Sequence, residues 1–331
     1  MSEEKQAASV AQNVLSTPVY AQTNNQPPGS GNMANRLIDA ISGTTAAATF
    51  AGELTLDNEE PRVVLLDAGA TATVPVKCDG ALATTLKKGN AWVRINLTAN
   101  ELLAAMKLSY NSGVAPPLAN IVVTLGGSDA LTMTKPDTDP KAKPMQDAIA
   151  AVIAAQVKVT NRDEIVSQAN DAGLIIARAM KLDVLKHRHF LYLFDVMEFV
   201  LARPLYEAKL HFDVARPDKT PGGEAIQPFV PVPAHQSFPS GHASYASAIV
   251  ELVIALVRLD PKQQAYLRVL AERIASNREG AGLHTSLDTN EGNKLGVFLG
   301  QWMAKAANEN VSYPKWATLV ADAQAEWKNF P

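Results

Sequence analysis

Residues 239–257, Pro-Ser-Gly-His-Ala-Ser-Tyr-Ala-Ser-Ala-Ile-Val-Glu-Leu-Val-Ile-Ala-Leu-Val, predict a helix that has a polar start and an apolar body. Pro239, Ser240 and Gly241 stand where the helix begins, so the backbone N–H groups of Ser240 and Gly241 lie at a helix N-terminus, which favours an anion. The apolar run is interrupted by two serines and a glutamate, and it is shorter than the ~20 residues that a membrane-spanning helix needs. We therefore expect no transmembrane segment here.

Helical spacing of apolar residues extends to both sides of this segment. It predicts helices at about 262–277, 284–304 and 315–328, and three more upstream, around 149–157, around 174–179 and from about Leu185 to Lys209. The chain from 141 to 331 is therefore expected to be a helical bundle.

The first 140 residues differ from the helical part in composition and in the pattern of their apolar residues. Residues 1–35 are rich in Gln, Asn, Ser, Ala and Pro, which predicts a flexible N-terminal arm. Residues 36–140 contain short β-prone runs, which predict a small β-rich region of unknown role. A proline-rich stretch at 134–144 is expected to mark the boundary with the helical part. The β-prone runs are Val63–Leu66, Ala72–Val74, Trp92–Leu97 and Ile121–Leu125.

Composition narrows the function classes. The 331 residues are 47% hydrophobic and 19% charged, which is typical of a water-soluble globular protein. A formal net charge of −3 leaves no overall positive field to attract nucleic acid. The single cysteine, Cys78, excludes an intramolecular disulfide. The acidic, polar N-terminus lacks a signal-peptide pattern, so the cytoplasm is the default expectation, and a periplasmic or secreted location stays open.

Basic and hydroxyl residues gather with histidines in three clusters of the helical half. All six histidines lie between His187 and His284. The first cluster runs from Lys209 to Pro217, the second is Pro239–His242, and the third runs from Arg278 to Asp288. Each cluster alone is ordinary, but together they contain the residue types that one tetrahedral oxyanion needs.

The chemistry of such a site follows from these residue types. Lys209, Arg216 and Arg278 supply three cations that can neutralise an anion. His284 and Asp288 are four residues apart, which we expect to be one helical turn, so the carboxylate can orient the imidazole as a nucleophile. His242 supplies a second imidazole that can act as a general acid. We expect no metal ion in this site.

The order Lys209-(six residues)-Arg216-Pro217, then Pro239-Ser240-Gly241-His242, then Arg278-(five residues)-His284-(three residues)-Asp288 resembles the type 2 phosphatidic acid phosphatase superfamily. That superfamily includes bacterial acid phosphatases, lipid phosphatases and vanadium-dependent haloperoxidases. The resemblance implies an α-helical catalytic domain. It also implies that His284 is the nucleophile, or the vanadate ligand, and that His242 is the acid–base. Asp288 would orient His284, and the anion would be bound by Lys209, Arg216, Ser240, Gly241 and Arg278.

One residue departs from the family pattern, and two features bear on the branch of this superfamily. Asn277 stands where the family usually has serine, which we expect to retune the site rather than disable it. His235 precedes His242 by seven residues, where haloperoxidases often carry a histidine or an aromatic residue. His235 therefore favours a haloperoxidase, whereas the compact spacing of the three clusters favours a phosphatase.

Three hypotheses follow. The first is a phosphoric monoester hydrolase that uses a phosphohistidine intermediate, needs no cofactor, and acts on a phosphorylated small molecule or a lipid headgroup. The second is a haloperoxidase with vanadate as cofactor. The third is an assembly protein with a vestigial site, in which residues 1–140 mediate homo-oligomerisation; an intact set of cluster residues argues against decay.

Other conspicuous residues are expected to be structural. His187 and His189 are two apart, so they point to different faces of a helix and predict a solvated helix start rather than a metal site. The tryptophans near the C-terminus are expected to be packing residues of the last helices, namely Trp302, Trp316 and Trp327.

Overall fold

The computed structural model describes two short strands, at 52–57 and 60–65, and then residues 91–111, 120–170, 172–183 and 185–328. The predicted arm, 1–35, and the β-prone run Ala72–Val74 lie outside these ranges. The described part is mainly helical, with a small three-stranded antiparallel sheet near its N-terminal side. The sequence-based expectation of a mainly α fold is therefore confirmed. No helix in the described ranges is long and apolar enough to cross a membrane.

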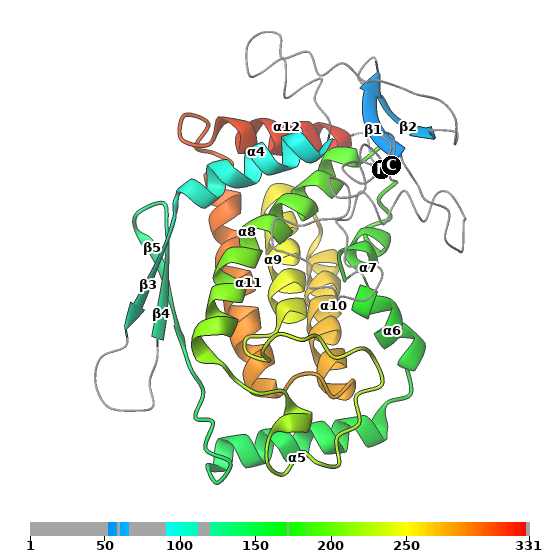
Figure 1. The fold of residues 1–331 in the computed structure, drawn as a ribbon. Helices are drawn as coiled ribbons and strands as arrows, with labels where there is room; N and C mark the ends of the chain where they lie inside the picture. The colour runs from blue at the N-terminus through cyan, green and yellow to red at the C-terminus, as the bar shows by residue number, and fades with distance from the viewer. Residues whose placement is uncertain are drawn as a thin grey trace, which may run out of the picture.

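The centre of the fold is a group of long helices that lie side by side (Figure 1). They are α8 (Arg188–Phe212), α9 (Gly241–Leu256), α10 (Pro261–Gly280) and α11 (Ser286–Ala306). The helix α9 has few polar residues and is buried along most of its length, because it is contacted by α8, α10 and α11. The predicted starts and ends of these helices agree with the structure to within a few residues.

Shorter helices cover the ends and one side of this group. Below it in Figure 1 runs α5 (Lys143–Lys158), which contacts α10 and α11. Two helices lie beside α10, namely α6 (Arg162–Asn170) and α7 (Ala172–Ala179). At the opposite end, α4 (Ala91–Ala104) lies along α12 (Pro314–Lys328), and both pack on α8.

The three-stranded sheet has the order β3–β4–β5, with β3 at Met106–Asn111, β4 at Asn120–Leu125 and β5 at Asp129–Thr134. Alternate residues of β4 are fully buried, as expected for a strand with one face on a core. That face belongs to the same hydrophobic core as α8, and β5 contacts α11. The sheet therefore packs on the helical part. Separately, β1 (Gly52–Asp57) pairs antiparallel with β2 (Glu60–Leu65).

Three glycines set the closest helix contact of the fold. On α11, Gly292, Gly296 and Gly300 face the backbone carbonyls of Ser240, Ser244 and Ala248 in the same order. A Cβ added at these glycines would come within 2.5, 2.2 and 2.4 Å of the carbonyl oxygens. The two helices therefore run parallel and in register, with their first residues at the same end of the bundle.

Two sequence-based expectations were wrong in this part of the chain. The predicted strand Trp92–Leu97 is the first half of α4, because Ile95, Ala99 and Leu102 recur at helical spacing and bury one face against the core. The helix α6 was not predicted, because its nine residues are mostly polar and show no clear apolar stripe.

Candidate oxyanion site

The three sequence clusters meet at one end of the bundle, the lower end in Figure 1. Lys209 lies in the last turn of α8 and Arg278 in the last turn of α10, while α9 and α11 begin there. The backbone N–H of Ser240 donates to the carbonyl of Asp288 at 3.0 Å, which ties the second cluster to the third. The helix α8 ends at Phe212 and is capped by Asp213, which has a φ of 47°, so Pro217 does not terminate it. Pro217 instead opens a short 3-10 helix, η1 (Pro217–Lys219).

His284 and Asp288 form the expected pair, but by a different local structure. Thr285 is the N-cap of α11, so His284 precedes the helix and does not share a helical turn with Asp288. Asp288 accepts the backbone N–H of Thr285 and the hydroxyl of Ser237, each at 2.7 Å, and lies 3.4 Å from His284 Nδ1. Burial alone would raise the pKa of Asp288, but these hydrogen bonds and His284 hold it below its ordinary value. Asp288 therefore remains a carboxylate.

Arg216 identifies the protonated nitrogen of His284. Its Nη1 atom lies 3.1 Å from His284 Nε2 and also donates to the Leu283 carbonyl at 2.9 Å. Because a guanidinium only donates, Nε2 must accept, and the proton of the neutral imidazole is on Nδ1, towards Asp288. Burial and the nearby Arg216 lower the pKa of His284 to about 3. Nε2 thus carries the lone pair that a nucleophile requires.

Lys209 has a different set of partners from the one that the sequence suggests. Its ammonium is almost completely buried and donates to three backbone carbonyls, those of Gln236, Ser237 and Pro239, at 2.7–2.9 Å. These bonds use all three of its hydrogens. Burial, followed by the charge of Arg216, lowers the pKa of Lys209 well below its ordinary value. In this structure Lys209 holds the loop that leads into α9.

Arg278 has unused hydrogen-bonding capacity. The residue is 0% exposed, and its Nη2 donates to the Ile165 carbonyl at 2.6 Å. Its Nε and Nη1 atoms are buried and have no hydrogen-bond partner within the described residues. Burial lowers the pKa of Arg278 to about 10, so it remains a cation at neutral pH. Buried N–H groups of this kind are satisfied in most proteins, which marks Arg278 as a candidate for binding an anion.

His242 lies on the exposed side of this group. It is half-buried at the start of α9, and its Nε2 lies 3.2 Å from the backbone carbonyl of Gln168. Burial lowers the pKa of His242 well below its ordinary value, and the charges of Arg278 and Arg216 add to that effect. A bound anion would act in the opposite direction and favour the imidazolium.

Ser240 and Gly241 occupy the expected position at the start of α9. Ser240 is the N-cap, and its hydroxyl accepts the backbone N–H of Ala243 at 3.4 Å. Its own N–H donates to the Asp288 carbonyl, whereas the amide of Gly241 has no such partner within the described residues. Gly241 is half-buried. The N-terminus of α9 is therefore partly open to solvent beside His242.

His235 is connected to the same group. It is half-buried, its Nδ1 lies 3.2 Å from Arg216 Nη2, and its ring meets that of Tyr206 edge-on at 5.4 Å. Burial and the charge of Lys209 lower the pKa of His235 to about 3. His235 is thus a neutral neighbour of an anion-binding candidate rather than a free surface histidine.

Asn277 does not face the cluster that its position in the sequence suggests. Its amide points to α6, where it bonds Gln168 and Glu164. The carbonyls of Ile165 and Gln168, which hold Arg278 and His242, belong to the same helix. The sequence did not predict that α6 takes part in the site, because any residue type can supply a backbone carbonyl.

The charges of this site do not balance. Lys209, Arg216 and Arg278 are each less than a tenth exposed, and none forms an ion pair with a carboxylate within the described ranges. Asp288 is the buried carboxylate beside them, and it is engaged with His284. Because buried charge is costly unless it is paired, the arrangement favours an anion as ligand.

The other histidines and tryptophans have structural roles. His187 and His189 are buried, so the expectation of a solvated helix start was wrong. His187 accepts the Asp183 N–H at the start of α8, and His189 pairs with Glu326 of α12. Trp302 and Trp316 are in the core, as expected, and Trp327 packs partly against it.

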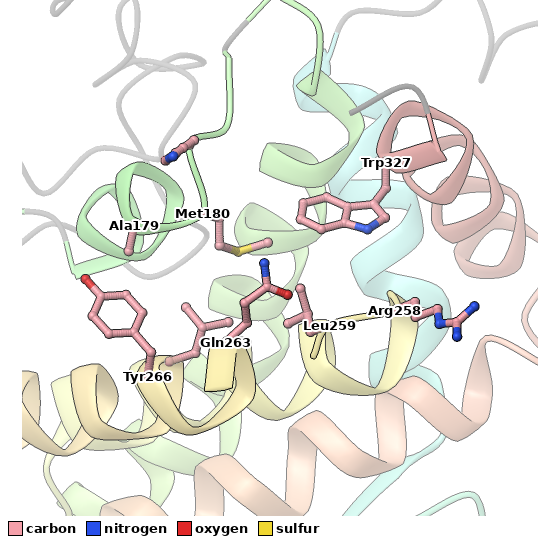
Figure 2. A pocket seen from close by; sticks show the side chains of 9 residues that line it. Ala179, Met180, Arg258, Leu259, Gln263, Tyr266 and Trp327 are labelled. Carbon is pink, nitrogen blue, oxygen red and sulfur yellow. The ribbon is translucent and has the colours of Figure 1, made fainter. Parts of the chain in front are cut away.

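A surface pocket of about 380 Å³ lies elsewhere, between the ends of α7 and α12 and the start of α10. Figure 2 shows Met180 and Gln263 facing each other across it, with Tyr266 and Trp327 at its two ends. Gln263 and Arg278 are fifteen residues apart on α10, roughly 22 Å along the helix. None of the sequence-predicted site residues lines this pocket.

Neither the models of known protein families nor the curated proteins gave a match to this chain.

Proposed function

We propose that the protein is a phosphoric monoester hydrolase that works through a phosphohistidine on His284. The observation that carries the proposal is the buried excess of positive charge beside a histidine whose unprotonated Nε2 faces Arg216. Arg278 contributes two buried nitrogen atoms without a partner within the described residues, and Arg216 contributes a donor already next to His284 Nε2. The resemblance of the three sequence clusters to type 2 phosphatidic acid phosphatases supports the same function and an acid-phosphatase type of helical domain.

In the proposed reaction, a phosphate monoester binds with its oxygens towards Arg216, Arg278 and the amide of Gly241. His284 Nε2 attacks phosphorus, and the bond to the leaving alcohol oxygen breaks as His242 Nδ1 gives that oxygen a proton. Water then attacks the phosphohistidine and loses a proton to His242, and phosphate leaves with His284 restored. Asp288 stabilises the positive charge that develops on His284. The cations stabilise the five-coordinate transition state.

His235 favours a second candidate, a vanadium-dependent haloperoxidase, because it lies beside Arg216 at the edge of the same site. The buried nitrogens of Arg278 and the lone pair of His284 also suit vanadate, which is a tetrahedral oxyanion like phosphate. Vanadate bound there would supply activation of hydrogen peroxide for halide oxidation. In that case His284 would be its ligand, and His242 would hold the proton that the chemistry requires.

One pair of assays tests the proposal. Hydrolysis of para-nitrophenyl phosphate is measured for the full chain and for His284→Ala, and bromination of a dye by peroxide is measured with and without saturating vanadate. We expect phosphatase turnover that His284→Ala abolishes. An unchanged rate in His284→Ala refutes the mechanism. Bromination that depends on vanadate, without phosphatase turnover, indicates a haloperoxidase. No activity in either assay favours a vestigial site.

A further inference from the structure

A polar contact between α6 and α10 lies directly behind the site. Asn277 Nδ2 donates to Gln168 Oε1 at 2.8 Å and to Glu164 Oε1 at 3.2 Å. Gln168 Nε2 donates to Glu164 Oε1 at 2.8 Å, and Asn161 Nδ2 donates to Asn277 Oδ1 at 3.2 Å. Gln168 is 0% and Asn277 8% exposed, so water does not readily replace these bonds.

The same segment of α6 touches His242. The backbone carbonyl of Gln168 lies 3.2 Å from His242 Nε2 and is among the last carbonyls of α6, which have no acceptor role inside the helix. A carbonyl only accepts, so this contact requires a proton on Nε2. Nδ1 is then the nitrogen that can take up or release a proton. The C-terminal end of a helix also favours a positive charge on a nearby imidazole.

We propose that Asn277 is a positioning residue, which acts through Gln168 to fix the ring orientation and the protonated nitrogen of His242. The side chain of Asn277 anchors that of Gln168, and the backbone of the same residue holds His242. The consequence for catalysis rests on the proposed function, in which His242 Nδ1 gives its proton to the leaving group. Which nitrogen of His242 carries the proton is set by the fold of the chain and does not depend on the reaction that the site catalyses.

The other groups that face His242 do not replace this contact. Arg278 from α10 and Arg216 from the segment after α8 act on His242 through their charge. His284 before α11 is neutral, and its Nε2 already accepts from Arg216. The two arginines only donate, so neither can accept the Nε2 proton. If α6 moves away, the imidazole loses the acceptor that selects the Nε2–H form, and the Nδ1–H form becomes populated.

Nitrogen-15 NMR of the imidazoles tests the proposal without using activity. Long-range proton–nitrogen spectra distinguish the two neutral forms, and His242→Gln assigns the signal. We expect the Nε2–H form in the parent chain and a mixture of both forms in Asn277→Leu, which keeps the volume but cannot donate. Ser276→Ala is the matched control, because Ser276 is exposed on the same helix and its hydroxyl donates to the Arg273 carbonyl of that helix. A parent-like His242 signal in a folded Asn277→Leu overturns the proposal; Asn277→Ala replaces it if the leucine variant does not fold.

Kinetics then separates this proposal from the proposed function. For Asn277→Leu we expect kcat for para-nitrophenyl phosphate to fall by roughly 10- to 100-fold with KM within about twofold, and the pH profile to change on the limb that reports His242. Gln168→Leu should have a similar effect, and the double variant should be little worse than either single one. If the losses in kcat of the two single variants add up in the double variant, Asn277 and Gln168 do not act on His242 through the same contact. If the parent chain shows no turnover that depends on His284, the proposed function fails, while the NMR result still decides the role of Asn277.

Discussion

Replacing Gly292 by alanine tests whether the contact between α9 and α11 sets the site. The new Cβ would lie 2.5 Å from the carbonyl oxygen of Ser240, whereas real Cβ contacts essentially never fall below 3.0 Å. The backbones of α9 and α11 must therefore move apart by at least about 0.5 Å near the start of α9, from 2.5 Å to 3.0 Å. The displaced oxygen belongs to backbone and cannot rotate away, so the strain is not relieved cheaply.

Two effects of Gly292→Ala oppose each other. Overpacking costs about 1–3 kcal/mol, and the better helix propensity of alanine returns about 1 kcal/mol. We expect a net loss of up to about 2 kcal/mol in the free energy of unfolding, measured by urea denaturation. The displacement also strains the bond between Ser240 N and Asp288 O, so phosphatase activity should fall by roughly tenfold or more.

Asn290→Ala is the matched control for this variant, because Asn290 is exposed on the same helix. The control should leave both stability and activity near those of the parent chain. If Gly292→Ala is more stable than the parent chain by about 1 kcal/mol, only helix propensity has acted. The close contact then does not constrain the site, and the reasoning is refuted.

Three further predictions concern charge at the site. Lys209→Met should lower the free energy of unfolding by about 3 kcal/mol or more in urea denaturation, because it leaves two buried carbonyls and one part-buried carbonyl without their donor. A variant that loses only anion affinity would contradict the role described for Lys209. Arg278→Ala should weaken vanadate inhibition by about 2–4 kcal/mol in a competition assay. Arg258→Ala is the control, because Arg258 is an exposed cation far along the bundle. Equal inhibition constants for Arg278→Ala and the parent chain would exclude Arg278 as an anion ligand. His284 and His235 have pKa values of about 3 in the folded chain and near 6.5 when unfolded, so the unfolded state binds more protons in between. Thermal stability should be full above pH 6.5 and decline as pH falls towards 3, and a flat profile over that range would contradict the buried neutral histidines.

The sequence predicted the long helices well and the short polar ones poorly. The start of α9 could be placed because Ser240 and Gly241 carry a local signal, and α10 because Asp260 and Pro261 do. Trp92–Leu97 was misassigned because its β-prone residues are also spaced for a helix, and only the packing of α4 on α8 and α12 decides between the two. Tertiary contact overrides propensity in such cases.

The site was predictable as a set of residues but not as a set of contacts. Side-chain type shows that Arg278 and His242 can serve an anion, but it does not show that α6 supplies their backbone acceptors. Likewise, nothing local to Lys209 indicates that it bonds three carbonyls between 236 and 239, some thirty residues away. The spacing of His284 and Asp288 suggested a helical turn, whereas the N-cap at Thr285 produces the same proximity. Long-range pairing of this kind depends on the whole fold.

The matching of Gly292, Gly296 and Gly300 with three carbonyls of α9 also limits how the chain can change in length. Both sets repeat every four residues, so the helices could slide past each other only in steps of about 6 Å. One residue inserted between Gly292 and Gly300 would rotate the later glycine by about 100° and bring a side chain against a carbonyl. Insertions and deletions should therefore be tolerated in the turn that follows Ala306, but not within this paired stretch.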